Sequence, residues 1–193
     1  MDKIDSLDKI NALVSDIRSL RKGYLSNFFL DRKKHSLWIE KGELFYVSFP
    51  DCYFLLHLTN SVNNLFFITT TSQQLAENLK AFLPIFAEQM VVDIVGDAKI
   101  VDLKDVFVEQ GFSVYEQLYR MNRIGTLEFK EIDTPNVCFA EDVDAQVVLD
   151  MLHSYFDPLS EQLPSYEEIL YFISQKSVLV YKEAGKVCLQ KHR

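Results

Sequence analysis

The chain has 193 residues, of which 48% are hydrophobic and 25% are charged, so it is neither an intrinsically disordered nor a collagen-like sequence. Its net charge of −8 argues against a protein that binds the nucleic-acid backbone, because no overall positive charge is present to replace the counterions of the phosphates. Three widely separated cysteines fit neither a disulfide framework nor a zinc site, and we expect no signal peptide, no membrane span and a cytoplasmic location.

The N-terminal part of the chain is predicted to form a helix followed by an antiparallel meander. Apolar residues recur at three- and four-residue steps over residues 3–22, which is the period of an amphipathic helix, and Gly23 is expected to end it. Turn-forming residues then separate several short apolar runs. We interpret these runs as three or four strands, at residues 37–39, 44–49, 53–58 and 65–69.

The period changes after residue 70. Thr71 and Gln74 have the spacing of a capping box, and the apolar residues behind them lie on one face of a helix. The next expected elements are a buried strand at 90–95, a short helix at 102–110 that Gly111 ends, and a long strand or a bent pair of strands at 112–124. This order indicates the α/β class, with a mixed, largely antiparallel sheet flanked by helices.

A polar, turn-rich segment at residues 126–135 is predicted to be a linker between a first domain, residues 1–125, and a second, residues 136–193. The elements expected in the second domain are, in order, a strand at 137–140, a helix capped by Asp142 or Asp144, a helix behind the capping box Ser165–Glu168, and a hairpin of strands 177–181 and 187–189. The last strand of this hairpin is expected to be an exposed edge.

The second domain resembles the opening half of the GNAT acyltransferase superfamily. This resemblance rests on the order of its elements and on the stretches FAEDVDAQVVLDMLHSYFDP, SYEEILYFI and SVLVYKEAGKVC. The first domain resembles the opposite, cofactor-binding half in the stretches FFITTTSQQLAENLKAFL, MVVDIVG and VFVEQGFSVYEQLYRM. The chain is therefore similar to a tandem of GNAT-like lobes, with a degenerate first lobe and a truncated second lobe.

The resemblance implies an acetyltransferase-like protein, because the family moves an acyl group from an acyl-CoA to an amine on a small molecule or a peptide. In the family a glycine-containing loop at a helix N-terminus holds the pyrophosphate of acetyl-CoA. The residues at the matching place are Thr70, Thr71, Ser72 and Gln73, and none of them is the glycine that lets a backbone approach phosphates closely. We therefore expect weak or absent binding of acetyl-CoA.

A second departure concerns the general acid. Many active relatives carry a tyrosine four positions ahead of the Gly-Phe pair, here Gly111-Phe112, and Phe107 occupies that position in this chain. A phenylalanine cannot donate a proton to a departing thiolate. The resemblance thus identifies no catalytic residue; in an intact relative the second lobe is the expected catalyst, and the first lobe shapes or docks the substrate.

Other groups of reactive side chains are interpreted as structural. Cys52 and His57 are expected to project from opposite faces of one strand, which argues against a thiol–imidazole pair, and the four histidines show no metal-ligand spacing. The basic stretch Arg32–His35 is interpreted as a solvated turn. The carboxylates of the second domain, interpreted as loop and cap charges with a general base as the alternative, are Asp157, Glu161, Glu167 and Glu168.

A second class of function remains open beside the acetyltransferase-like one. A final strand with an unpaired edge can be covered by another chain, so the protein is also consistent with a non-catalytic interaction or regulatory module. Such a module would dock a partner or form a homodimer through the terminal strand. The aromatic residues Tyr115 and Tyr119, with Arg120 and Arg123, are interpreted as the surface or interface of a strand.

Overall fold

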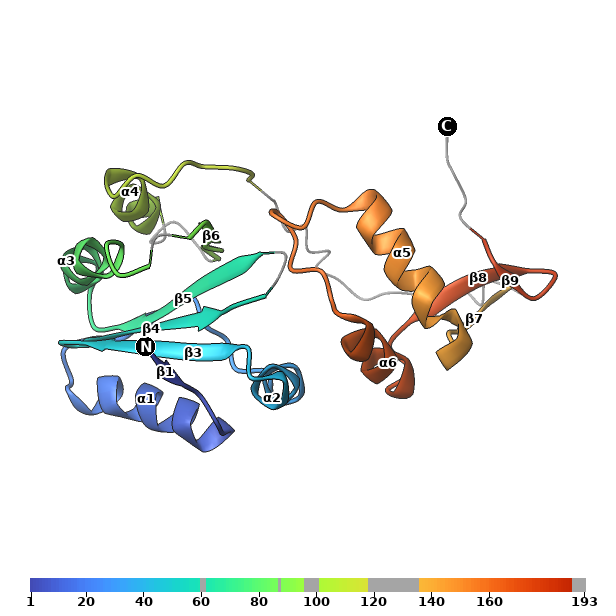
Figure 1. The fold of residues 1–193 in the computed structure, drawn as a ribbon, viewed down its shortest axis with the longest axis horizontal. Helices are drawn as coiled ribbons and strands as arrows, with labels where there is room; N and C mark the ends of the chain where they lie inside the picture. Colours follow the sequence, from blue (N-terminus) through green and yellow to red (C-terminus); the bar gives the residue numbers. More distant parts are fainter. Residues whose placement is uncertain (60–61, 87, 96–100, 118–135, 189–193) are drawn as a thin grey trace, which may run out of the picture. The chain divides into compact units, whose positions relative to one another are not determined.

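The computed structural model describes residues 1–59, 62–86, 88–95, 101–117 and 136–188 (Figure 1). The chain divides into two compact units, Met1–Tyr115 (unit 1) and Glu116–Arg193 (unit 2). Both combine helices with strands, and the predicted fold class, α/β with a mixed, largely antiparallel sheet, is confirmed. The predicted linker at 126–135 lies outside the described residues.

Unit 1 is built on a six-stranded sheet whose centre is an antiparallel meander. The meander consists of β3 (Leu44–Phe49), β4 (Cys52–His57) and β5 (Asn63–Thr69). The short outer strands are β1 (Asp2–Lys3) beside β3, β2 (Leu25–Ser26) antiparallel to the end of β5, and β6 (Met90–Val91) parallel to the start of β5. Two different segments therefore share the second edge of β5.

Helices cover both faces of this sheet (Figure 1). On one face, α1 (Leu7–Ser19) and α2 (Arg32–Lys41) bury residues such as Ile10 and Trp38 against β3, β4 and β5. On the other face, α3 (Ser72–Phe82) and α4 (Val101–Glu109) bury residues such as Leu79 and Phe107 against β4 and β5. Removal of these apolar side chains from water on both faces is the main stabilising contribution to unit 1.

Two elements of unit 1 differ from the prediction because caps set their limits. The helix predicted at 3–22 begins only at Leu7, since the Ser6 hydroxyl accepts the N–H of Lys9 and the residues before it join the sheet. The apolar run 37–39, predicted as a strand, lies in α2. Asp31 caps that helix and Gly42 ends it at φ 73°.

The predicted strands after α3 are also different. The strand predicted at 90–95 is paired only over Met90–Val91. Of the strand predicted at 112–124, residues 112–117 are not in a strand, and the rest lies outside the described residues. Gly111, at φ 93°, reverses the chain, so that the Phe112 N–H bonds to the Phe107 carbonyl and the two rings pack 5.2 Å apart.

Unit 2 contains a three-stranded antiparallel sheet with two helices on one face. Its elements are β7 (Val137–Phe139), a 3-10 turn (Asp142–Asp144), α5 (Ala145–Tyr155), α6 (Tyr166–Ser174), β8 (Leu179–Glu183) and β9 (Lys186–Val187). The predicted capping box of Ser165 and Glu168 is confirmed, and the Asp144 carboxylate accepts the N–H of Glu141. Ala184 and Gly185, both with positive φ, make the tight turn between β8 and β9.

The two units repeat the same opening arrangement of strands and helices. In each, a first strand is followed by two helices and then by an antiparallel hairpin, and the first strand pairs with the first strand of the hairpin; in unit 1 the short strand β2 lies between the two helices. The bond that closes this pairing is Ile4 N–H to the Leu44 carbonyl in unit 1 and Ala140 N–H to the Val178 carbonyl in unit 2, each at 2.9 Å. None of the helices among the described residues is long and apolar enough to cross a membrane.

Candidate functional site

The four residues of the predicted cofactor loop lie at the N-terminus of α3, directly after β5. Thr71 is the N-cap, and its hydroxyl accepts the backbone N–H of Gln74 at 3.2 Å. The structure shows only this half of the predicted capping box at Thr71, and the Gln74 side-chain NH₂ donates to Glu77 at 3.1 Å. The Gln73 side chain also donates to Glu77, at 3.0 Å. The first turn of α3 is thus held by its own side chains.

Gly23 packs against this loop from the α1 side. A Cβ built on Gly23 would lie 2.6 Å from the backbone oxygen of Thr70, and the residue has φ 117°. Only glycine meets both conditions, since an L side chain would clash and would be strained at this φ. Thr70 itself is buried, and its hydroxyl makes no hydrogen bond to any described residue. The structural role of Gly23 is therefore this close approach.

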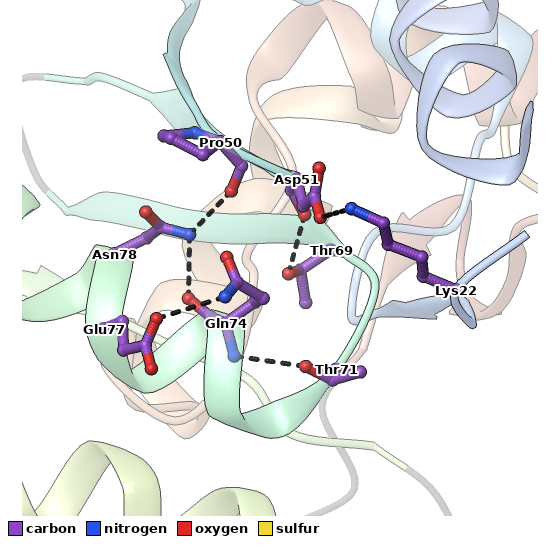
Figure 2. A network of polar contacts seen from close by, with 8 residues as sticks. All are labelled: Lys22, Pro50, Asp51, Thr69, Thr71, Gln74, Glu77 and Asn78. Carbon is purple, nitrogen blue, oxygen red and sulfur yellow. Dashed lines mark hydrogen bonds and ion pairs between the residues drawn. The ribbon is translucent and has the colours of Figure 1, made fainter. Parts of the chain in front are cut away.

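A polar network fixes the loop to the β3–β4 turn (Figure 2). The turn residue Asp51 has φ 57°, and its backbone carbonyl accepts the Thr69 hydroxyl at 3.0 Å and the Thr70 N–H at 3.3 Å. On α3, the Asn78 amide donates to the carbonyls of Pro50, at 3.0 Å, and Gln74, at 2.8 Å. The turn and the first turns of α3 therefore form one rigid assembly.

The lysine that contacts this assembly, Lys22, is already paired with a carboxylate. The Lys22 ammonium forms an ion pair with the Asp51 carboxylate (Figure 2), with Nζ 2.6 Å from Oδ2. A lysine engaged with a carboxylate offers less attraction to a phosphate than an unpaired one, since the two charges largely cancel at a distance. The electrostatics of the α3 N-terminus therefore add little to the partial positive charge of the helix end.

The second edge of β5 is occupied by the chain itself. At the start of the strand, Asn63 and Asn64 pair with β6. In the middle, the buried Asn27 side chain accepts the Phe67 N–H at 2.7 Å and donates to the carbonyls of Leu65, at 3.3 Å, and Asp93, at 3.0 Å. β2 then pairs with the last two residues of β5. An extended ligand could bind this edge only by displacing residues 25–27.

The position that matches the general acid is buried in the core. Phe107 is 3% exposed, and its ring packs 5.9 Å from Phe67 and 5.2 Å from Phe112. It is an apolar core residue of the α3–α4 face. The general acid implied by the resemblance therefore has no counterpart at this position.

Cys52 and His57 lie on opposite faces of β4, as predicted. The Cys52 thiol is buried in the α3–α4 cluster, and burial raises its pKa to about 12, so that it stays protonated and unreactive at neutral pH. His57 stacks on Trp38 on the other face, with ring centroids 3.7 Å apart, and its Nε2 lies 3.2 Å from a Glu43 carboxylate oxygen. No thiol–imidazole pair forms.

The remaining sequence-predicted residues have structural roles or are not described. The stretch Arg32–His35 is the first turn of α2 rather than a free turn, and the His35 side chain is buried. Glu168 accepts the Ser165 N–H and Asp157 accepts the Leu159 N–H, so both carboxylates cap backbone groups. Tyr115 is 60% exposed outside any strand, whereas Tyr119, Arg120, Arg123 and His192 lie outside the described residues. Within the described ranges, no three His, Cys, Asp or Glu side chains gather to hold a metal ion.

Sequence reasoning did not identify Asn27. This residue is separated from Phe67 by 40 positions, and no local pattern signals such a contact. A tandem of lobes was expected from the resemblance, but the matching register of the first strand pairs in the two units is visible only in the structure. Comparison of the chain with protein-family models, curated proteins and solved structures gave no significant match.

The residues at the α3 N-terminus do not fit the pyrophosphate of acetyl-CoA. A phosphate cradle needs free backbone N–H groups and a backbone that a ligand can approach. Here the Thr71 hydroxyl takes one of these N–H groups and Gly23 packs against the Thr70 carbonyl. The arrangement is a packed junction between a strand and a helix.

Proposed function

We propose that this protein is acetyltransferase-like in architecture, with two GNAT-like lobes, and that its first lobe shapes or docks a substrate without binding acetyl-CoA. The repeated arrangement of strands and helices in units 1 and 2 supports the tandem. In unit 1 an antiparallel meander is followed by a helix and by a strand that is parallel to β5, and this β5–α3–β6 connection supports the likeness of the first lobe to the GNAT family. In relatives of such lobes the reaction is transfer of an acyl group from acyl-CoA to an amine, on a small molecule or a peptide.

The observation that carries this proposal is the closed second edge of β5 beside the self-capped N-terminus of α3. Both places where an acyl-CoA could meet backbone groups are taken by residues of the same unit, namely Asn27 and Thr71. Phe107 supports the same conclusion, since it offers no proton. The proposed setting is the cytoplasm, with neither nucleic acid nor membrane as partner, in keeping with the acidic composition.

The test is calorimetric titration of the full chain with acetyl-CoA, with free CoA as the control ligand. We expect no heat of binding up to millimolar ligand from either compound. Micromolar binding of acetyl-CoA, or acetylation of any small amine by the chain, would overturn the proposal. A crystal structure of unit 1 would test the likeness of the lobe independently of its activity.

One observation favours a second candidate, a non-catalytic interaction module. Unit 2 exposes apolar side chains on one face of its sheet, and within the described residues β9 pairs only with β8. Such a surface can dock a partner or a second copy of the chain. Sedimentation velocity over a wide concentration range tests the second copy, and a monomer at every concentration would exclude it.

A further inference from the structure

Within the described part of unit 2, the sheet has one apolar face that α5 and α6 do not cover. Val180 points to the face on which α5 and α6 pack, and it is buried. The cross-strand pairs Val137–Tyr181 and Phe139–Leu179 point the other way, because neighbouring residues of a strand alternate between faces. We name these four residues the open face.

The side chains of the open face are unusually accessible for apolar residues. Phe139 is 50% exposed, Leu179 is 62% exposed and Val137 is 40% exposed. The Tyr181 hydroxyl donates to Glu183 and accepts from the Asn136 amide, which gives the face a polar border at one end. A contiguous apolar centre with a polar border is typical of a binding surface.

Unit 1 shows what covers the equivalent face. The matching bonds Ile4–Leu44 and Ala140–Val178 place Phe45 at the position of Leu179 and Val47 at the position of Tyr181. In unit 1, Phe45 and Val47 pack against the cluster that α3 and α4 complete. The inner face of α3 consists of apolar residues at helical spacing, Leu75, Leu79 and Phe82. The cover that fits this surface is therefore an amphipathic helix.

The net charge of unit 2 indicates which kind of helix could bind, a helix of a second copy or a basic helix of another protein. Residues 136–188 contain nine Asp and Glu residues but only three Lys residues and no Arg. At the border of the open face, Glu183 of β8 is the cross-strand partner of Lys186 of β9, so the negative charge is that of the unit and not of this border. A second copy would bring the same negative charge to the interface, and like charges oppose association, whereas a basic helix would be attracted.

We propose that the open face of unit 2 binds a basic amphipathic α-helix of another polypeptide. Its apolar side would carry Leu and Phe at the spacing of α3, and its lysines or arginines would be attracted by the net negative charge of residues 136–188. This inference rests on the second candidate function and is independent of the first, because acetyl-CoA would involve the α3 N-terminus of unit 1. The acetyl-CoA titration and the peptide-binding experiment can therefore succeed or fail independently of each other.

The probe is a labelled synthetic peptide with the sequence of residues 71–84 and the changes Gln73→Lys, Glu77→Lys and Ala81→Lys. These positions are exposed on α3, so the peptide keeps the apolar side and, with Lys80, presents four lysines. The matched control peptide carries Gln73→Glu, Lys80→Glu and Ala81→Glu, which give four glutamates with Glu77. Fluorescence anisotropy with the full chain measures both affinities.

We expect the basic peptide to bind at least tenfold more tightly than the acidic one in low salt, with a smaller difference in high salt. The substitutions Leu179→Lys and Phe139→Lys should each lower the affinity of the chain for the basic peptide at least tenfold. Val143→Lys, at an 81% exposed position of the 3-10 turn before α5, adds the same charge away from the open face and should leave the affinity unchanged.

Four results would overturn the proposal. Unchanged affinity of the basic peptide for both Leu179→Lys and Phe139→Lys would show that it binds elsewhere. Equal affinity of the two peptides would show that charge has no role in the binding. Binding of neither peptide would show that the open face does not bind such a helix. A wild-type dimer in sedimentation velocity that Leu179→Lys dissociates would assign the open face to a second copy. Because the substituted residues are exposed, circular dichroism should show unchanged folding of each variant.

Discussion

The side-chain oxygen of Asn27 accepts the backbone N–H of Phe67 at 2.7 Å, in the interior of unit 1. The same side chain donates to the carbonyls of Leu65 and Asp93. One carboxamide thus replaces the backbone groups of a neighbouring strand beside Leu65 and Phe67, where both β2 and β6 have ended. Asn27 connects the two segments that share the second edge of β5.

Replacement of Asn27 should destabilise unit 1 strongly. The Asn27→Ala variant leaves the Phe67 N–H and the Leu65 carbonyl buried without this partner, at a cost of about 1–3 kcal/mol for each group. Urea unfolding followed by the fluorescence of Trp38, the single tryptophan and a buried residue of unit 1, measures the loss. Asn11→Ala, at an exposed position of α1, is the matched control and should be neutral. Equal stability of the two variants would contradict the bridging role of Asn27.

The contact of Gly23 with Thr70 predicts unequal effects of two glycine substitutions. Gly23→Ala adds a Cβ 2.6 Å from the Thr70 oxygen at a φ of 117°. A Cβ added at Gly111 has no other atom within 4 Å, so Gly111→Ala is destabilised only by the unfavourable φ of 93° and not by a clash. We expect a loss of about 1 kcal/mol for Gly111→Ala and clearly more for Gly23→Ala. Thermal melts of both variants test this order, and the reverse order would refute the close approach.

Two neighbouring threonines should respond in opposite directions to the same change. The buried Thr69 hydroxyl donates to the Asp51 carbonyl, whereas the buried Thr70 hydroxyl bonds to no described residue. Thr69→Val should therefore destabilise unit 1 by about 1 kcal/mol, and Thr70→Val should stabilise it by a similar amount. Urea unfolding followed by Trp38 fluorescence compares the two. A loss of stability in Thr70→Val would show that its hydroxyl is satisfied in solution.

Much of the local structure was predictable because short-range signals specify it. Thr71 and Ser165 both cap the helices that follow them, and the turn at Ala184-Gly185 makes the expected hairpin. The apolar run 37–39 was predicted wrongly because three apolar residues fit a strand as well as one face of a helix. Only the caps Asp31 and Gly42 decide between them.

The contacts that close the candidate site could not be predicted in the same way. The bonds of Asn27 with β5, the packing of Gly23 on Thr70 and the pairing of Lys22 with Asp51 each join residues far apart in the chain. Their sequence positions carry no periodicity and no motif. The sequence shows that the segment Thr70–Gln73 lacks a glycine. It does not show that residues 25–27 occupy the second edge of β5.

Two of the three cysteines, Cys52 and Cys138, should differ sharply in reactivity. Cys52 is buried, and burial raises its pKa to about 12, whereas Cys138 is exposed. Because the thiolate is the nucleophile, iodoacetamide at neutral pH should label Cys138 in the folded chain and spare Cys52 until urea unfolds unit 1. Peptide mapping by mass spectrometry identifies the labelled positions. Rapid labelling of Cys52 in the folded chain would contradict its place in the core.

Unit 1 should lose stability as the pH falls because of His35. Burial, with a further contribution from Lys34, lowers the pKa of His35 to about 4, and its Nδ1 accepts the Asp31 N–H at 2.9 Å. Since the folded-state pKa lies below the ordinary value of about 6.5, the unfolded chain binds the proton first. The stabilising contribution is complete above about pH 6.5 and is lost as the pH falls toward 4, to a total on the order of 3 kcal/mol. Urea unfolding followed by Trp38 fluorescence at several pH values measures how the free energy of unfolding changes with pH.

The variant His35→Phe tests whether His35 causes this change. It should be less stable at pH 7, because it loses the acceptor of the Asp31 N–H, but its free energy of unfolding should change less between pH 6.5 and 4. An unchanged slope in His35→Phe would assign the acid sensitivity to other groups.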